Sequence, residues 1–201
     1  GYSAVNGDLN SETIDILRRW DIHQPINFEQ HRNKSCVVLV DHNQATQWAQ
    51  GLEPSSISGI LDHHALQTRN FPAAIHVDIR PWGSTSTILA HISISEGRQL
   101  SPSFAGILLS GLLSDTLVLQ SPTTTAVDIE IASRLAVLAG VTSMKELGDA
   151  IMSAKDNDIM SLGVDKLVRQ DFKTFEMERA EQGTPWRLGF GVIETRAAQR
   201  M

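Results

Sequence analysis

The sequence is poor in cysteine and has no long apolar run. Cys36 is the only cysteine among 201 residues, so no disulfide can form within the chain and a reducing compartment is expected. No apolar stretch approaches the roughly 18 residues that a membrane-spanning helix needs, and the N-terminus lacks the basic–apolar–small pattern of a secretion signal. We therefore predict a cytoplasmic protein that has no membrane as a partner.

An excess of positive charge is also missing. The formal net charge is −6, which disfavours nucleic acid as a partner but not an anionic substrate, because a bound metal ion can reverse the local charge. Apolar residues make up 41% of the chain and charged residues 20%, so a core of ordinary size can form. Cys36 opens an apolar run, and a buried, inert thiol is expected there.

Apolar runs and amphipathic stretches follow one another along the chain. Residues 36–43, "CVVLVDHN", have the pattern of a buried parallel strand, 57–64 that of a second strand, and 74–81 that of a half-exposed or edge strand ended by Pro81. Helices are predicted over 11–20, 84–97, 101–116, 126–140, 144–156 and 163–171. We expect alternating strands and helices up to about residue 170, in a Rossmann-like α/β fold whose parallel sheet carries helices on both faces.

The pattern changes after about residue 170. Residues 173–195 predict two strands around a turn at Gly183–Pro185, and a different module is expected to begin there.

Polar side chains follow two of the predicted strands at the point where each strand ends. Asp41 follows the first strand, and Asp62, His63 and His64 follow the second. Ligands bind at the carboxyl ends of strands in open α/β sheets, so these groups would meet if the two strands are neighbours. An aspartate after a strand can equally be a turn former or helix cap, and a histidine can be structural, so residue types alone leave both interpretations open.

Asp115 follows the apolar stretch 101–114, where a deeply placed carboxylate is expected. A buried carboxylate needs a partner, and a metal ion would be one. Carboxylate and imidazole ligands without thiolate suit Mn²⁺, Co²⁺, Mg²⁺ or Fe²⁺ better than structural zinc.

These residues carry a family resemblance that covers nearly the whole chain. The sequence resembles the DHH phosphoesterase superfamily, and within it is most similar to the family II, manganese-dependent inorganic pyrophosphatases. The stretches that carry the resemblance are, in order, "VNGDLNSETIDIL", "VVLVDHN", "GILDHHAL", "RPWGSTSTIL", "AGILLSGLLSDTLVLQSPTTT" and "DFKTFEM".

The resemblance implies a role for each matching residue. Asp41 would bridge two metal ions, and His63 and Asp115 would be ligands of the second ion. His64 and Lys173 would contact the substrate phosphate.

Further residues would support these groups. Asp62 would take part in catalysis by orienting a histidine, and Gly83, Ser84 and Thr85 lie where a helix N-terminus could face phosphate groups. His42 and Asn43 could be neighbours of the ligands. His76 and His91 are expected to be structural.

The implied function is hydrolysis of inorganic pyrophosphate to two orthophosphates by a water activated between two metal ions. The expected metal is Mn²⁺, with Co²⁺ and Mg²⁺ as alternatives, and the expected assembly is a homodimer. Two alternatives are another DHH phosphoesterase, such as an exopolyphosphatase or a nucleotide phosphodiesterase, and a non-catalytic metal- or partner-binding relative.

The chain lacks two features of the family. An N-terminal strand followed by His-x-Asn-Pro-Asp-x-Asp has no counterpart, and most of the small C-terminal domain is missing. We therefore expect a fragment with little activity of its own. Residues 1–170 would form the DHH domain without its first strand, and 171–201 the linker and the beginning of the domain that closes on substrate.

Overall fold

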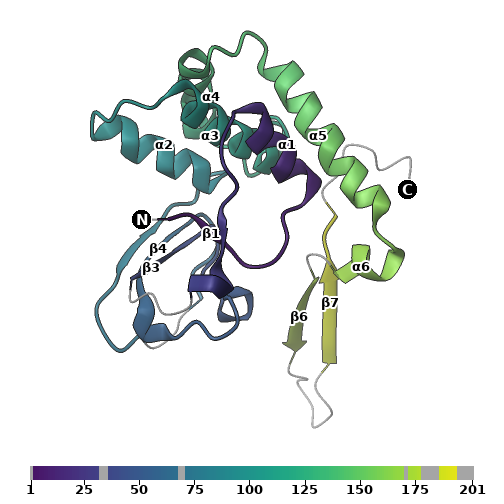
Figure 1. Ribbon diagram of the computed structural model, residues 1–201. Coiled ribbons are helices and arrows are strands. Elements are labelled where there is room, and N and C mark those ends of the chain that lie inside the picture. Colours follow the sequence, from purple (N-terminus) through teal and green to yellow (C-terminus); the bar gives the residue numbers. More distant parts are fainter. Residues whose placement is uncertain (1, 32–35, 68–70, 170–171, 178–185, 194–201) are drawn as a thin grey trace. The chain divides into compact units, whose positions relative to one another are not determined.

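The computed structural model describes residues 2–31, 36–67, 71–169, 172–177 and 186–193 (Figure 1). The chain divides into two compact units, residues 1–151 and 152–201. The predicted candidate metal ligands all lie in the first unit, while Lys173 lies in the second. The assignment of 1–170 to a DHH domain and 171–201 to the beginning of a second one stays a prediction.

A three-stranded parallel sheet places the polar strand ends of the first unit. Its order is β3–β4–β5, with Leu39 paired to Ile60 and Ile60 to Val77. Since β3 and β4 are neighbours and run the same way, the residues that follow them emerge at the same edge, as the sequence predicts. The strands of this sheet are β3 (Val37–Val40), β4 (Ile57–Asp62) and β5 (His76–Ile79).

The prediction of a buried strand over 36–43 is wrong in one respect. Among the described strands, β3 lies at an edge of the sheet, and β4 is the central one. Leu39 is buried, but Val38 and Val40 are 54% and 42% exposed. Cys36, just before β3, is exposed as well, with its Sγ 3.2 Å from Ser58 Oγ, so the expected buried thiol is also wrong.

The expected alternation of strands and helices is wrong as well. Residues 41–56 and 63–75 connect the three strands, and the described parts of these connections hold only short 3-10 helices. These are η2 (Ala45–Gln47) and η3 (Pro54–Ser56). Trp48, Leu52 and Phe71 from the connections pack on a cluster that includes Leu39 and Ile60. Apolar side chains of these connections therefore cover part of the sheet, and no described α-helix does so between its strands.

One described helix precedes the three-stranded sheet in the chain, and the other described helices follow it. Their main core is almost entirely helical, with Leu109, Leu112 and Leu135 at its centre, which the apolar character of 101–116 explains. Figure 1 shows α2, α3 and α4 side by side. The helices are α1 (Ser11–Arg19), α2 (Thr85–Ser95), α3 (Pro102–Asp115), α4 (Ala126–Ala139), α5 (Met144–Ser161) and α6 (Val164–Arg169).

Capping residues fix most helix ends of the first unit where the sequence signals them. Asn10 Oδ1 accepts from the Thr13 amide at the start of α1. Gly140 ends α4 in a left-handed conformation with φ 70°, the usual role of glycine at a helix C-terminus. A further pair, β1 (Ala4–Val5) and β2 (Ile26–Asn27), forms a short parallel ladder, and η1 (Phe28–His31) follows it.

The second unit contains the two predicted strands after residue 170. They are β6 (Phe172–Met177) and β7 (Trp186–Gly191), and they pair antiparallel, with Lys173 opposite Phe190. The turn predicted at Gly183–Pro185 lies outside the described residues. Over the part of the chain that the structure describes, no helix has the length and apolar character needed to cross a membrane.

Candidate metal centre

Asp41 is held at the end of β3 by an unusual backbone conformation. Its amide donates to the Leu61 carbonyl at 2.9 Å, which extends the β3–β4 ladder by one bond. Its φ is +66°, in the left-handed region that aspartate tolerates better than most residues. The side chain is 52% exposed, and a carboxylate oxygen lies 3.5 Å from His63 Nε2.

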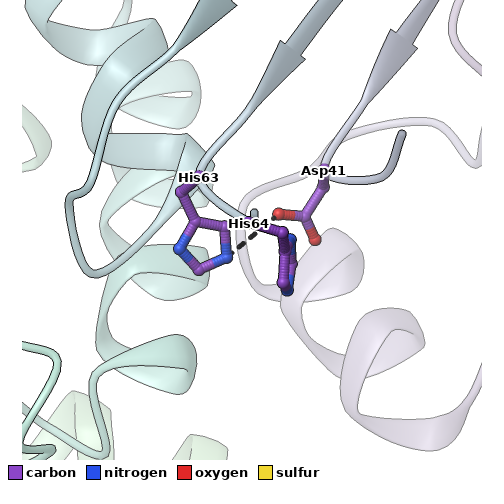
Figure 2. Close-up of side chains that lie close together, drawn as sticks. All are labelled: Asp41, His63 and His64. Carbon is purple, nitrogen blue, oxygen red and sulfur yellow. Dashed lines mark ion pairs between the residues drawn. The ribbon is translucent and has the colours of Figure 1, made fainter. Parts of the chain in front are cut away.

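His63 turns one ring nitrogen to the protein and the other to Asp41. Its Nδ1 lies 3.0 Å from the Trp82 carbonyl oxygen. A carbonyl can only accept, so Nδ1 carries the proton, and in the neutral ring Nε2 has a free lone pair. Nε2 faces the Asp41 carboxylate and is available as a metal ligand (Figure 2).

His64 is oriented in the same way by a carboxylate. Its Nδ1 donates to Asp62 Oδ1 at 2.8 Å, and its ring packs edge-on against His63 with centroids 4.2 Å apart. The proton on Nδ1 leaves Nε2 of the neutral ring as the acceptor. A carboxylate behind a histidine is the usual way in which metal sites fix the ring and its tautomer.

Asp62 is fully buried, yet each of its oxygens has a partner. Oδ1 accepts from the backbone amides of His63 and His64, at 2.8 and 3.1 Å, as well as from the His64 ring, and Oδ2 accepts from Asn43 Nδ2 at 2.6 Å. Burial raises the pKa of Asp62, but the hydrogen bonds from His64 and Asn43 outweigh it and the net pKa is lowered. Asp62 is therefore ionised at neutral pH.

Asn43 connects this carboxylate to the loop after β4. Besides the bond to Asp62, its Nδ2 donates to the Ala65 carbonyl and its Oδ1 accepts from the Gln67 amide at 2.7 Å. The sequence suggests Asn43 as a neighbour of the ligands, and the structure places it behind Asp62.

Asp41, His63 and His64 form a potential metal-binding cluster. Each offers one ligand atom, and these atoms lie within 4.8 Å of one another (Figure 2). Both histidines use Nδ1 for a hydrogen bond that leaves Nε2 available, and Asp41 has an exposed carboxylate. One hard oxygen and two imidazole nitrogens suit Mn²⁺ or Co²⁺, so the residues present fit the predicted metal.

Asp115 is placed differently from the expectation. It is the last residue of α3 and is half-buried rather than deeply buried, because the helix ends there. Its Oδ2 accepts from Ser84 Oγ at 2.6 Å. Asp115 does not belong to the three-residue cluster, and its role as a ligand stays a prediction.

The sequence interpretation missed the buried carboxylate of Asp128. It accepts from the Gly83 amide at 2.9 Å, from Thr87 Oγ1 at 2.6 Å, and from both the amide and the hydroxyl of Thr125. Burial raises the pKa of Asp128, but hydrogen bonds from Thr125, Thr87 and Gly83 lower it further than burial raises it. The signal was present, because Thr125 and Asp128 in "TAVD" form a capping box at the start of α4.

Asp128 also lies close against Gly83, in the stretch that precedes α2. A Cβ on Gly83 would lie 2.9 Å from Asp128 Oδ2 and 2.8 Å from Thr116 Cγ2. Ser84 caps α2 through the Ser86 amide. The suggestion that Gly83, Ser84 and Thr85 face phosphate groups stays a prediction, as does the phosphate contact of Lys173.

The chain is similar to pyrophosphatases of known name. No protein-family model matches it. A relative from Methanocaldococcus jannaschii named manganese-dependent inorganic pyrophosphatase is 33% identical, over 96% of this chain and 62% of the relative. The chain thus spans about three fifths of that relative's length. This comparison confirms the resemblance to manganese-dependent inorganic pyrophosphatases that the sequence indicates.

Solved structures give the same result for the fold. The crystal structure of a family II inorganic pyrophosphatase from Methanococcus jannaschii matches with a TM-score of 0.80 and 32% identity, over 96% of this chain and 64% of that one. An exopolyphosphatase-related protein from Bacteroides fragilis matches with a TM-score of 0.55 and 15% identity, over 86% of this chain and 52% of that one. The second match is to the fold alone. The α/β fold class predicted from the sequence is confirmed.

Proposed function

Because the chain is homologous to manganese-dependent inorganic pyrophosphatases, we propose that it acts in the metal-dependent hydrolysis of inorganic pyrophosphate to two orthophosphates. The observation that carries this proposal is the Asp41, His63 and His64 cluster, whose ligand atoms lie within 4.8 Å of one another at the ends of β3 and β4. The similarity to the Methanocaldococcus jannaschii relative supports Mn²⁺ as the metal.

The cluster residues have separate tasks in this proposal. Asp41 and His63 hold metal through the carboxylate and Nε2, and Asp115 is a further ligand from the end of α3. Two divalent ions, when bound, supply an acidified water as nucleophile and neutralise charge on the phosphate oxygens. Ser84 keeps the Asp115 carboxylate oriented through its 2.6 Å hydrogen bond.

His64 is assigned to the substrate. Its Nδ1–H donates to Asp62 Oδ1 at 2.8 Å, which fixes the ring and leaves Nε2 as the nitrogen that would face a phosphate oxygen. Asp62 acts through His64 and does not touch substrate. Lys173 supplies a positive charge for phosphate.

Two coarser properties complete the proposal. We place the protein in the cytoplasm, because its one cysteine fits a reducing compartment. We also propose a homodimer, with neither nucleic acid nor membrane as a partner. Sedimentation equilibrium of the purified chain tests the dimer.

The proposal is tested in two steps on one sample. Calorimetric titration with Mn²⁺ measures metal binding, and release of orthophosphate from pyrophosphate in the same sample measures turnover. We expect micromolar Mn²⁺ binding that Asp41→Ala abolishes, while Asp15→Ala, which removes an exposed ion-paired carboxylate of α1, leaves it unchanged.

The possible results of these two measurements test the metal site and the hydrolysis of pyrophosphate separately. Manganese-dependent release of two orthophosphates per pyrophosphate that is lost in Asp41→Ala supports both parts. Binding without turnover supports the metal site and removes the reaction from this chain. Manganese binding that Asp41→Ala leaves intact overturns the site. Faster release of orthophosphate from tripolyphosphate than from pyrophosphate overturns the assignment of pyrophosphate as the substrate.

A further inference from the structure

We propose that four side chains beyond the metal cluster position His63 through the backbone carbonyl of Trp82. They are Asp78, Arg80, Trp82 and His91, here called the Arg80 cluster. The inference rests on the proposed function in treating His63 as a metal ligand. It adds residues that act on the ligand through the main chain and touch neither metal nor substrate.

Arg80 is the centre of the cluster and is held from several sides. Its Nε and one terminal nitrogen each donate to Asp78 at 2.8 Å, which fixes the plane of the guanidinium. The other terminal nitrogen lies 3.1 Å from His91 Nδ1, on α2. The Arg80 and Asp78 side chains are 27% and 19% exposed, so solvent competes weakly for these bonds.

The Trp82 ring packs on this fixed group. The guanidinium carbon of Arg80 lies 4.8 Å from the centre of the Trp82 ring, a cation–π distance. The edge of the ring meets His91, with centroids 5.1 Å apart. Contacts to a charged plane and to a helix thus restrain the ring in two directions.

The backbone of this segment is anchored as well. The Arg80 amide donates to the Asp62 carbonyl at 3.2 Å, and the Trp82 amide donates to the Arg80 carbonyl at 2.8 Å. The Trp82 carbonyl therefore has a fixed direction relative to the end of β4, where His63 begins. His63 Nδ1 donates to it at 3.0 Å.

The consequence for His63 is a fixed tautomer. As long as the Trp82 carbonyl stays in place, Nδ1 keeps the proton and Nε2 presents its lone pair beside Asp41. If the Trp82 ring loses its support, the carbonyl can turn away, and the proton can move to Nε2. That tautomer offers no lone pair to a metal ion on the Asp41 side. The Arg80 cluster is thus a set of positioning residues.

The test measures the tautomer and metal affinity separately. Two-bond proton–nitrogen correlation spectra of the metal-free protein, recorded at mildly alkaline pH, report which nitrogen of His63 carries the proton. We expect Nδ1–H in the unchanged chain and in Trp82→Phe, which keeps an aromatic face for Arg80. In Trp82→Ala we expect a substantial Nε2–H fraction and Mn²⁺ affinity lowered roughly tenfold, the lower end of what outer-shell partners usually contribute.

Controls distinguish positioning from general loss of structure. Arg98→Ala breaks an exposed ion pair with Glu96 after α2 and should change neither readout. If Trp82→Ala does not fold by circular dichroism, Arg80→Lys decides, since lysine cannot form the two-bonded contact with Asp78. Unchanged tautomer and unchanged affinity in the folded variant overturn the inference. If the tautomer shifts in Trp82→Ala but the chain does not hydrolyse pyrophosphate, the inference about His63 is supported. The missing turnover then counts only against the proposed reaction.

Discussion

At the level of single residues, two buried carboxylates organise the first unit, and neither is proposed to touch the metal. Asp62 orders the end of β4, His64 and Asn43. Asp128 joins the starts of α2 and α4 through Gly83, Thr87 and Thr125. Both are stable as charged groups because the surrounding donors replace the water that burial removes.

Asp62→Asn should damage the metal centre without a change in its ligands. An amide nitrogen would replace one acceptor oxygen, so either Asn43 or His64 loses its partner. We expect Mn²⁺ affinity to fall about tenfold, because Asp62 Oδ1 also accepts from the His63 amide and so helps to fix that ligand. Calorimetry measures it, with Asp15→Asn as the exposed control. Equal affinities in the two variants would contradict the assigned role of Asp62.

Asp128 should make the stability of the fold depend on pH in the acid range. Its pKa in the folded chain lies below the ordinary 3.8, so it stabilises the folded state fully above that value. The contribution is lost as the pH falls through the lowered folded pKa. The free-energy difference between the unchanged chain and Asp128→Asn should therefore shrink as the pH falls below the ordinary pKa of 3.8.

Denaturant unfolding at several pH values measures this difference. At neutral pH we expect Asp128→Asn to cost about 2–3 kcal/mol, because several hydrogen bonds to a charged group are weakened. A difference that stays constant or grows toward acid pH would count against the assigned state of Asp128.

At the level of elements, the helices and the parallel strands could be predicted from periodicity, but their surroundings could not. Apolar period and end signals such as Gly140 are local, so α3 and α4 follow from the sequence. Whether a β-branched strand is central or at an edge depends on its neighbours, and β3, with exposed Val38 and Val40, shows this. The general alternation of strands and helices was wrong because Trp48 and Leu52 cover the sheet from connections without helical periodicity.

In the candidate site, too, some features could be predicted from the sequence and others could not. Asp41, His63 and His64 could be placed together from strand ends, because parallel neighbours share an edge. The Trp82 carbonyl could not be predicted, since a backbone acceptor leaves no mark in the residue types. Asp115 could be recognised by resemblance, but its burial depends on where α3 ends, and that end lies nearer the surface than the apolar run suggests.

The packing of α1 on α3 gives a prediction at the same scale. Gly106 lies under Trp20, and a Cβ there would lie 2.3 Å from the indole ring. Trp20 Nε1 donates to Ser110 Oγ at 2.9 Å, so the ring cannot move away without losing that bond. We expect Gly106→Ala to lower the free energy of unfolding by about 1–3 kcal/mol through overpacking.

Gly163→Ala is the matched control, because nothing lies within 4 Å of its added Cβ. Denaturant unfolding of both variants measures the two effects. If Gly106→Ala is as stable as Gly163→Ala, the expected overpacking between Trp20 and a Cβ at position 106 is contradicted.

At the level of the whole molecule, the proposed metal ion would join the ends of two neighbouring strands that lie far apart in the sequence. Asp41 follows β3 and His63 and His64 follow β4, with residues 42–56 and β4 between them in the chain. A ligand that binds only the folded state stabilises it by mass action. The Asp41 side chain is 52% exposed, so its charge is solvated without a metal; the metal-free chain should therefore fold, and the metal should add to its stability.

Manganese should therefore raise the melting temperature, and a chelator should reverse the change. At a free Mn²⁺ concentration of about 100 times Kd the expected gain is roughly 2.7 kcal/mol, which corresponds to a shift of about 5–10 °C for a chain of this size. Asp41→Ala should melt near the metal-free temperature and show no shift, because its carboxylate is the oxygen ligand of the cluster. Mg²⁺ at the same concentration should give a smaller shift, since an imidazole nitrogen such as His63 Nε2 suits Mn²⁺ better. A shift of equal size in Asp41→Ala would mean that the metal stabilises the chain from another site.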